Sequence, residues 1–457
     1  MIGSVRLAEV AAAINAQHRG TNVPFQSVST DTRTLQSGDL FVALTGDRFD
    51  GHEYIRQAEE NGAAAVMISR EVPTRVPYLM VSDTLTGLAD LAKFNRDRFT
   101  GPLVAITGSS GKTTVKEMMA HILRCEAGEE EVLATRGNFN NHIGAPLTLL
   151  RLSKQHTHAV IELGASAEGE IAYTAKLAQP NVSILTNADA AHLEGFGDID
   201  TVARTKGEII DHLGEGGTAI LNADSPYFEQ WAERASEHGK QVLSFGVSEL
   251  ANVTAQNIES DDQGCCQFQM MTPNGKANVK LSVMGKHNVV NALAATAASL
   301  ALELPLKNIV AALQTFSGVQ GRLLVMDGMN GSTVIDDSYN ANPASVRAAI
   351  DTLASRGGQR IFVLGDMAEL GAETQRAHAE MGAYAREAGI NCFLAIGEFS
   401  RAAVTAFGDN GHWFATQDSL VRFLTRQLSS DVTALVKGSR SARMDRVVGE
   451  IKNENKE

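Results

Sequence analysis

Residues 103–118 are the stretch that most constrains how this chain can fold. Residues 103–106 are all apolar and predict a buried strand. Apolar residues then recur at helical spacing from residue 115 to residue 122, so a helix follows. The loop between them is rich in glycine and serine and must turn the backbone tightly. A strand, a glycine loop and a helix start in that order form a cradle for polyphosphate, because backbone N–H groups and the positive end of the helix dipole face the anion.

The side chains of this loop predict how a nucleotide is held. Lys112 has the reach to contact the terminal phosphates, and the hydroxyl of Thr113 is placed to hold Mg²⁺. The loop departs from the pattern G-x-x-x-x-G-K-[ST], because Ile106 stands where the first glycine is expected. A simple Gly-Ser turn before a lysine is the alternative, and the flanking strand and helix favour the phosphate site. The residues expected around the phosphates are Gly108, Ser109, Ser110, Gly111, Lys112, Thr113 and Thr114.

Composition bounds the class of protein. A length of 457 residues is enough for roughly three domains. Hydrophobic residues make up 44% of the chain, charged residues make up 20%, and no run of 18 apolar residues occurs, so we expect an ordinary globular protein. The formal net charge of −13 argues against a nucleic-acid partner held by a basic face.

Cysteine usage and the start of the chain indicate a compartment. The four cysteines fit neither a disulfide framework nor a zinc site, and we expect idle thiols in a reducing cytoplasm: Cys125, Cys265, Cys266 and Cys392. The first residues lack a basic stretch followed by an apolar core, so no secretory signal is expected.

Strand-like and helical segments alternate along the chain, which predicts an α/β fold in three domains. Residues 1–84 form a small α/β domain with an expected helix at 5–14 and strands at 26–28, 40–44, 64–68 and 78–81. Residues 85–316 form a central domain with a mostly parallel sheet, expected strands at 103–106, 159–163, 182–186 and 219–222, and helices at 169–178, 201–213 and 288–301. Residues 317–457 form a second open, Rossmann-like α/β domain with expected strands at 333–335, 361–364, 392–396 and 432–436.

The central domain also carries an antiparallel signal. Residues 265–272 and 277–283 are two strand-like runs, and residues 273–276 join them with an Asn-Gly pair. Asn-Gly between two such runs is a strong hairpin signal, so we expect an antiparallel flap on this domain.

Three further side chains are candidates for chemistry in the central domain. Glu162 ends a predicted strand, where α/β domains bind ligands, and is placed to take Mg²⁺ through oxygen. Its alternative is an N-cap or surface acid. His192 follows the next strand, and a lone histidine is more often structural than functional. Lys206 lies on a predicted helix and, judged by composition alone, would be solvated.

The phosphate loop alone leaves the activity open. A switch GTPase needs an Asn-Lys-x-Asp sequence to select guanine, and neither residues 186–189 nor residues 221–224 supply it. That favours ATP. A simple kinase remains open, because the motif indicates only that a terminal phosphate is moved or hydrolysed.

The sequence resembles the Mur ligases, which are relatives of folylpolyglutamate synthase. Residues 107–114 resemble the short phosphate loop of that family. Further stretches agree in order across nearly the whole chain: 29–43 with 50–52, 136–144, 191–197, 285–292, 336–343 and 364–371. The last two are most similar to the branch that adds D-alanyl-D-alanine to UDP-N-acetylmuramoyl-tripeptide.

The resemblance implies a cytoplasmic step in building the peptidoglycan precursor, performed by an ATP- and Mg²⁺-dependent ligase. ATP would phosphorylate the terminal carboxylate of the tripeptide, and the amine of D-alanyl-D-alanine would attack the acyl phosphate. The first domain would bind the UDP-sugar, the central domain ATP, and the third would contribute to nucleotide and D-alanyl-D-alanine binding. We expect a monomer with small-molecule substrates, no nucleic-acid partner and no membrane span.

The resemblance also implies roles for single residues. Lys112 would lie on the phosphates, Thr113 and Glu162 on one Mg²⁺, and His192 on a second. Lys206 occupies the place of a lysine that many members carbamylate into a metal ligand. Asn291 would face adenine, and Arg322 and Asp337 would approach the ribose and phosphates. Asn138 and Asn141 would line the path of the muramyl-peptide, while the uridine diphosphate end would be held by Ser29, Thr30 and Arg33, whose residue types alone equally fit turn chemistry.

Two other activities are compatible with the sequence. One is the sister ligase that adds the third residue to UDP-muramyl-dipeptide, whose first domain is similar. The other is a nucleotide-binding module that closes on ATP without chemistry. The dependence of ADP release on the amine substrate separates the three.

Overall fold

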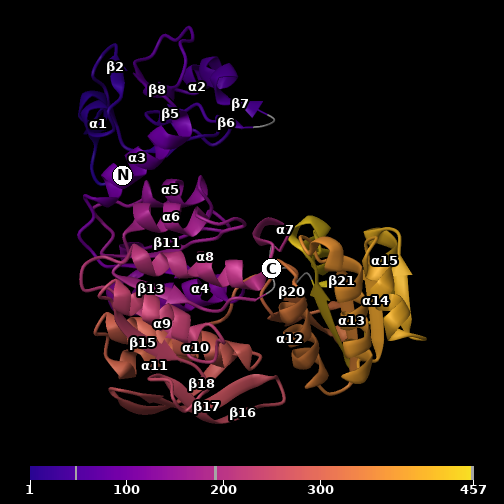
Figure 1. Cartoon of the computed structure of the whole chain (residues 1–457). Coiled ribbons are helices and arrows are strands. Elements are labelled where there is room, and N and C mark those ends of the chain that lie inside the picture. The colour runs from indigo at the N-terminus through magenta and orange to yellow at the C-terminus, as the bar shows by residue number, and fades with distance from the viewer. Residues whose placement is uncertain (47–48, 190–192, 454–457) are drawn as a thin grey trace.

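The computed structural model describes residues 1–46, 49–189 and 193–453. The chain forms three lobes, and each lobe is built around its own larger sheet (Figure 1). The amino-terminal lobe sits above the central lobe, and the carboxyl-terminal lobe lies to one side of it in this view (Figure 1). The predicted α/β class is confirmed, while the boundaries at residues 84 and 316 stay predictions.

The amino-terminal lobe holds a five-stranded sheet in the order β2-β9-β8-β5-β4. Its pairs are parallel except β2 with β9. The elements of the lobe are β1 (Val5–Arg6), α1 (Leu7–Ala13), β2 (Gln17–Arg19), β3 (Pro24–Phe25), β4 (Val28–Ser29), β5 (Leu40–Val42), β6 (Thr45–Gly46), β7 (Phe49–Asp50), α2 (Ile55–Glu60), β8 (Ala65–Ile68) and β9 (Tyr78–Met80). The strand expected at 26–28 is confirmed only at Val28, which begins β4, because residues 26–27 lie between β3 and β4.

The central lobe is a six-stranded parallel sheet in the order β11-β12-β10-β13-β14-β15. Its strands are β10 (Leu103–Thr107), β11 (Val132–Ala134), β12 (His158–Glu162), β13 (Val182–Leu185), β14 (Thr218–Asn222) and β15 (Gln241–Phe245). The four predicted strands are confirmed. The two that were not predicted, β11 and β15, form the edges of the sheet.

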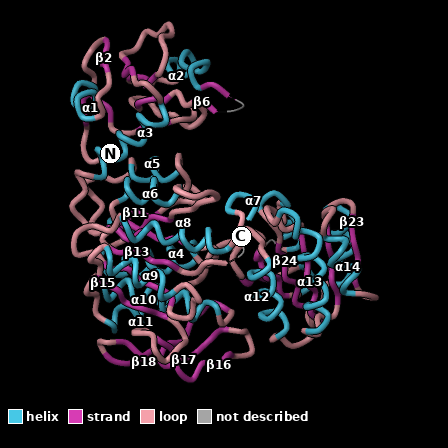
Figure 2. Tube along the Cα trace, in the orientation of Figure 1, coloured by secondary structure: helices cyan, strands magenta, loops and turns pink. Residues whose placement is uncertain are grey.

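Helices cover both faces of this sheet (Figure 2). Alternate residues of β10 separate the two faces, because Leu103 and Ala105 pack in one hydrophobic cluster and Val104 and Ile106 pack in another. The first cluster is shared with α3 (Thr84–Arg96), α5 (Gly144–Leu149), α6 (Glu170–Ala178), α8 (Ile199–Asp211) and α9 (Phe228–Glu237). The second is shared with α4 (Lys112–Ala127), α10 (His287–Ala301) and α11 (Leu306–Thr315). The short α7 (Leu193–Phe196) precedes α8. The helices expected at 169–178, 201–213 and 288–301 are confirmed.

An antiparallel flap of three strands lies on the central lobe, at its lower end in Figure 2. Its strands are β16 (Thr254–Ser260), β17 (Cys265–Thr272) and β18 (Gly275–Met284). The predicted hairpin is confirmed, but its turn is shorter than expected. Thr272 pairs with Gly275, so only Pro273 and Asn274 form the connection.

The carboxyl-terminal lobe holds a six-stranded sheet in the order β19-β20-β24-β21-β22-β23. Only β19 with β20 is antiparallel. The strands are β19 (Leu324–Asp327), β20 (Thr333–Asp337), β21 (Gln359–Gly365), β22 (Cys392–Ile396), β23 (Gly411–Phe414) and β24 (Val432–Lys437). The helices are α12 (Pro343–Ala354), α13 (Thr374–Glu387), α14 (Ser400–Phe407), α15 (Gln417–Gln427) and α16 (Asp445–Ile451). The four predicted strands are confirmed, and the unpredicted β19 and β23 are again the edges.

All four cysteines are free thiols. Within the described part of the chain, no helix has both the length and the apolar character needed to cross a membrane.

Candidate active site

The predicted phosphate loop joins β10 to α4 at the carboxyl edge of the central sheet. Gly108 has a φ of +145° and Gly111 a φ of +78°, values that side chains rarely adopt. A Cβ built at Gly108 would lie 1.9 Å from the Thr186 hydroxyl oxygen, which donates a hydrogen bond to the carbonyl of Ser110. Both the backbone angle and the lack of space therefore require glycine at position 108.

We expect Gly108→Ala to destabilise the protein by about 2–4 kcal/mol and to weaken ATP binding, because the loop must move away from Thr186. Urea unfolding and calorimetric titration with ATP measure the two effects. The matched control is Gly169→Ala, which also has a positive φ, +84°, but no atom within 4 Å of its Cβ position. It carries only the backbone cost of about 1 kcal/mol. Equal losses in the two variants would show that space at Gly108 is unimportant.

Residues that follow β13 brace the phosphate loop. The side-chain oxygen of Asn187 accepts hydrogen bonds from the backbone N–H groups of Ser109 (3.1 Å) and Ser110 (2.9 Å). Its amide nitrogen donates to the Ser110 hydroxyl at 2.9 Å. The Ser109 hydroxyl donates to the carbonyl of Asp189, and burial raises the pKa of the Asp189 carboxyl. Asn187 and Asp189 were not predicted as site residues. Their position could have indicated them, because they follow β13, which pairs in parallel with β10.

Lys112 begins α4 and folds back over the loop. Its Nζ donates to the carbonyl oxygens of Gly108 (2.6 Å) and Ser109 (3.2 Å). Burial lowers the pKa of this ammonium group, the Glu162 carboxylate raises it, and the Arg322 guanidinium lowers it further. Thr113 and Thr114 follow in the first helical turn, where backbone N–H groups have no partner within the helix. This end of α4 is suited to an anion.

Glu162 is the last residue of β12 and pairs in register with Ile106, just before the phosphate loop. Only 2% of it is exposed, so the alternative of a surface acid is wrong. One carboxylate oxygen, Oε1, accepts a hydrogen bond from the Asn140 amide at 2.8 Å. The other oxygen, Oε2, is buried and has no hydrogen-bond partner within the described residues. An unpaired carboxylate oxygen in such a place is suited to a cation.

Lys206 lies on α8 and is also only 2% exposed, so the expectation of a solvated lysine is wrong. Its Nζ donates to the carbonyl of Ala165 at 3.2 Å and lies 5.3 Å from the centre of the Phe196 ring. Burial, followed by the nearby positive charge of Lys112, lowers the pKa of this amine to about 7. A large share of Lys206 is therefore neutral near pH 7.

The structure describes only some of the residues that were predicted as metal ligands. His192 lies outside the described residues. Among the residues that the structure describes, no group of three or more histidine, cysteine and acidic side chains is arranged to hold a metal ion.

Two of the predicted third-domain residues lie close to this site. The Arg322 guanidinium stands 4.2 Å from the centre of the Tyr339 ring, and its charge acts on Lys112. Asp337 ends β20 and is paired with Lys437 at 2.5 Å. Lys437 is buried, which lowers its pKa. The imidazole of His287, at the start of α10, lies near Asp337, and burial lowers its pKa.

Lys437 and His287 were not predicted as site residues. Lys437 directly follows the strand expected at 432–436, and His287 lies within the stretch 285–292 that resembles the family. The position after a predicted strand could have indicated Lys437, and the family-like stretch could have indicated His287.

Asn291 lies on α10 beside the loop. Its side-chain oxygen would be 2.7 Å from a Cβ at Gly111, and its amide donates to the Asn288 side chain at 2.9 Å. The structure thus brings Asn291 to the phosphate loop from the helix that covers the opposite face of the sheet from α8.

The predicted substrate residues lie on two other segments of the chain. The Ser29 hydroxyl donates to the carbonyl of Asp31, and the Arg33 side chain, 84% exposed, pairs with the Asp31 carboxylate at 2.6 Å. These contacts match the turn chemistry that was the alternative for this segment. Asn138 is exposed, and the Asn141 oxygen accepts from the backbone N–H of Gly144 at the start of α5.

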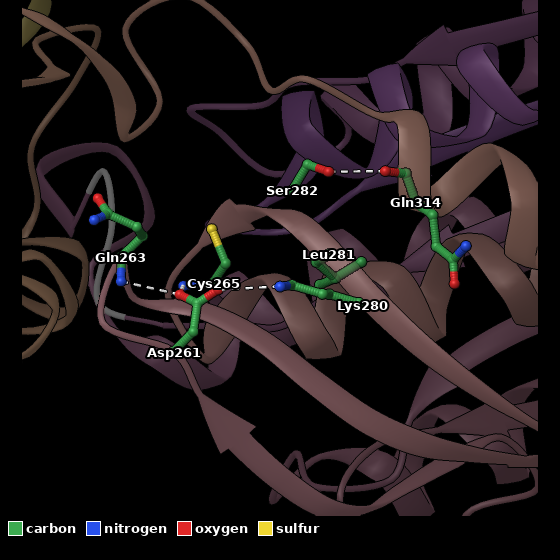
Figure 3. Close-up of a pocket in the computed structure, with 7 residues that line it drawn as sticks. All are labelled: Asp261, Gln263, Cys265, Lys280, Leu281, Ser282 and Gln314. Atoms are coloured by element: carbon green, nitrogen blue, oxygen red, sulfur yellow. Dashed lines mark hydrogen bonds and ion pairs between the residues drawn. The ribbon is translucent and has the colours of Figure 1, made fainter.

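A separate cavity of about 350 Å³ lies on the flap (Figure 3). Asp261 there faces Lys280 at 3.6 Å, and Ser282 donates to the carbonyl of Gln314. None of its lining residues belongs to the phosphate loop or the strand ends around it.

The sequence and the three-lobed fold resemble those of known proteins. Three protein-family models match the chain. The model described as "Mur ligase family, catalytic domain" matches residues 24–96, and "Mur ligase middle domain" matches residues 106–299. The model described as "Mur ligase, glutamate ligase domain" matches residues 321–440. The chain is 43% identical over 448 residues to the UDP-N-acetylmuramoyl-tripeptide–D-alanyl-D-alanine ligase of Escherichia coli (strain K12), covering 97% of this chain and 98% of that relative. This chain belongs to the Mur ligase family.

Solved structures agree with the family assignment. MurF from Acinetobacter baumannii is 35% identical and superposes with a TM-score of 0.92 over 98% of this chain and 99% of that one. MurF ligase from Thermotoga maritima, solved in complex with ADP, is 27% identical and gives a TM-score of 0.82 over 93% and 96% of the two chains. The resemblance to Mur ligases found in the sequence motifs is confirmed, and the use of ATP by that family agrees with the phosphate loop.

Proposed function

We propose that this Mur ligase joins D-alanyl-D-alanine to the terminal carboxylate of UDP-N-acetylmuramoyl-tripeptide with ATP, as a cytoplasmic monomer in peptidoglycan precursor synthesis. The full-length identity of 43% to a ligase of that name supports this reaction. The observation that carries it in the structure is the meeting of Lys112, Glu162 and Lys206 at one sheet edge, where Glu162 and Lys206 are buried and Lys112 is half-buried.

The reaction requires an activated carboxylate. Transfer of the terminal phosphoryl group of ATP to the tripeptide carboxylate gives an acyl phosphate and ADP. The amine of D-alanyl-D-alanine then adds to the acyl carbon, the tetrahedral intermediate expels phosphate, and the nitrogen loses a proton. Several negative charges must approach one another in these steps, so fixed cations and precise alignment supply much of the rate enhancement.

The residues have distinct proposed roles. Lys112 and the loop residues 108–114 hold the phosphates, Asn291 faces adenine, and Arg322 and Asp337 contact the ribose and phosphates from the third lobe. Residues 1–84 bind the UDP-sugar, residues 85–316 bind ATP, and residues 317–457 contribute to nucleotide and dipeptide binding. In substrate binding, Asn138 and Asn141 line the path of the muramyl-peptide, and Ser29, Thr30 and Arg33 hold the uridine diphosphate end.

The residues present fit Mg²⁺. The buried Oε2 of Glu162, which has no partner in the described part of the chain, and the hydroxyl of Thr113 are hard oxygen donors, which this ion prefers. When bound there, the ion would neutralise phosphate charge. A second Mg²⁺ is proposed at His192 and Lys206. A neutral amine is a poor ligand for this ion, so Lys206 would serve it as a carbamate, and its lowered pKa favours that reaction with CO₂.

The test is amine-dependent release of ADP. With ATP and UDP-N-acetylmuramoyl-tripeptide, we expect turnover only when D-alanyl-D-alanine is added. Turnover that instead requires UDP-muramyl-dipeptide with diaminopimelate or lysine would assign the sister reaction, and no amine-dependent turnover with any muramyl-peptide would leave a nucleotide-binding module. Mass spectrometry of the products from tripeptides ending in diaminopimelate or in lysine then identifies the preferred substrate.

A further inference from the structure

The loop after β11 fixes the Glu162 residue at two points. The backbone N–H of Glu162 donates to the Thr135 hydroxyl at 3.0 Å. The Glu162 side chain accepts a hydrogen bond from the amide of Asn140 through Oε1. Thr135 and Asn140 lie five residues apart in the same loop, so a single segment controls both the backbone and the carboxylate of Glu162.

We propose that Asn140 is a positioning residue, which holds one carboxylate oxygen of Glu162 so that the other faces the phosphate loop as a cation ligand. This inference rests on the proposed function, because it deepens the role given there to Glu162. This role differs from the substrate-binding role proposed for the neighbouring Asn138 and Asn141.

The surroundings of the carboxylate support this role. The Glu162 carboxylate lies close enough to the Lys112 ammonium and the Tyr339 phenol to raise the pKa of both groups, so it stands near the phosphate loop and the third lobe. A carboxylate on a side chain with three rotatable bonds would otherwise turn in its cavity. The hydrogen bond to Oε1 removes that freedom, and Oε2 has no hydrogen-bond partner among the residues that the structure describes. Partners of this kind orient metal ligands, and their loss typically weakens metal affinity or activity about 10–100-fold.

Asn140 is itself held in place. Its carbonyl accepts from the backbone N–H of Gly164 at 2.8 Å, two residues beyond Glu162. A Cβ at Gly164 would lie 3.0 Å from the Asn140 side chain, so the two segments are in close contact. At the start of the loop, the buried Lys116 donates to the carbonyl of Thr135 at 2.7 Å. The loop is therefore anchored at both of the residues that contact Glu162.

The test measures metal binding in the complex of the full chain with ADP, with Mn²⁺ as the probe and electron paramagnetic resonance as the readout. We expect Asn140→Ala to weaken Mn²⁺ affinity about 10-fold or more, and to lower kcat while the KM for UDP-tripeptide changes little. Asn138→Ala, the control in the same loop, should leave Mn²⁺ affinity unchanged. If Asn140→Ala does not fold, Asn140→Ser replaces it with the same expectation.

A double-mutant cycle decides whether Asn140 acts through Glu162. In the Glu162→Gln background, we expect Asn140→Ala to weaken Mn²⁺ affinity by no more than about 2-fold, because the group it orients has already lost its charge. The same loss in both backgrounds, or no loss in the single variant, overturns the inference. Unchanged Mn²⁺ affinity in Glu162→Gln alone overturns the proposed role of Glu162 in metal binding, and this inference with it.

Discussion

Replacing Lys112 with alanine should lower kcat by about 1000-fold or more, because the transferred phosphoryl group then loses its nearest fixed cation. The ammonium group lies within hydrogen-bond distance of two loop carbonyls, and the charge of Glu162 raises its pKa. It therefore stands where the terminal phosphates are expected. ADP release that depends on D-alanyl-D-alanine measures the loss. The KM for ATP should rise as well, because Lys112 also contributes to binding in the ground state.

Two controls make that result interpretable. Lys176→Ala removes an exposed lysine from α6 and should keep normal activity. Circular dichroism and thermal unfolding of Lys112→Ala should stay close to those of the parent protein, because burial disfavours the charged form of this lysine and relief of that cost offsets the lost attraction to the Glu162 and Asp189 carboxylates. Near-normal turnover in a folded Lys112→Ala variant would contradict the assignment of the phosphate loop.

The sequence predicted the strand–loop–helix unit because every local preference there agrees. Residues 103–106 are apolar on both sides of the strand, as a central parallel strand requires, and the glycines stand where the backbone adopts a positive φ. In the two six-stranded sheets, the strands it missed, β11, β15, β19 and β23, are all edges. An edge strand is covered by neighbours less completely, so its apolar run is short and weakly marked.

Single side chains could be predicted only where position in the sheet decides their direction. Glu162 was found because it ends a parallel strand. The run 138–141 contains three asparagines, and the sequence could not tell which one faces Glu162. The turn decides it: the backbone N–H of Asn140 bonds to the carbonyl of Asn138, and the Asn140 side chain then reaches the carboxylate.

Long-range packing explains the remaining misses. The Lys437–Asp337 pair joins residues 100 positions apart, and no local pattern marks it. Lys206 is buried by contacts with the carbonyl of Ala165 and the ring of Phe196, which lie on separate segments. On its own helix it stands among polar residues, so composition predicted a solvated side chain.

The burial of Lys206 leads to a second large effect: Lys206→Met should abolish turnover and yet make the folded protein more stable at pH 7. The folded pKa of about 7 lies well below the ordinary value of 10.5. Between those values the unfolded chain binds more protons than the folded one, so the free energy of unfolding rises with pH from about 7 to 10.5. At pH 7 and below, the folded protein therefore carries the full cost of the buried amine, for which the size of the shift sets an upper limit of about 5 kcal/mol. Methionine removes that cost.

We expect a net gain of about 2 kcal/mol at pH 7, because the variant also loses the hydrogen bond to Ala165 and the contact with Phe196. The gain should shrink as the pH rises from 7 to 9.5, since the parent protein recovers stability over that range and the variant does not. Urea unfolding in buffers free of CO₂ measures both values, and Lys176→Met, on an exposed helix face, should show no such trend. A Lys206→Met protein that is less stable than the parent at pH 7, with the same pH dependence, would mean that this amine remains charged in the folded state. An active variant would mean that the site works without it.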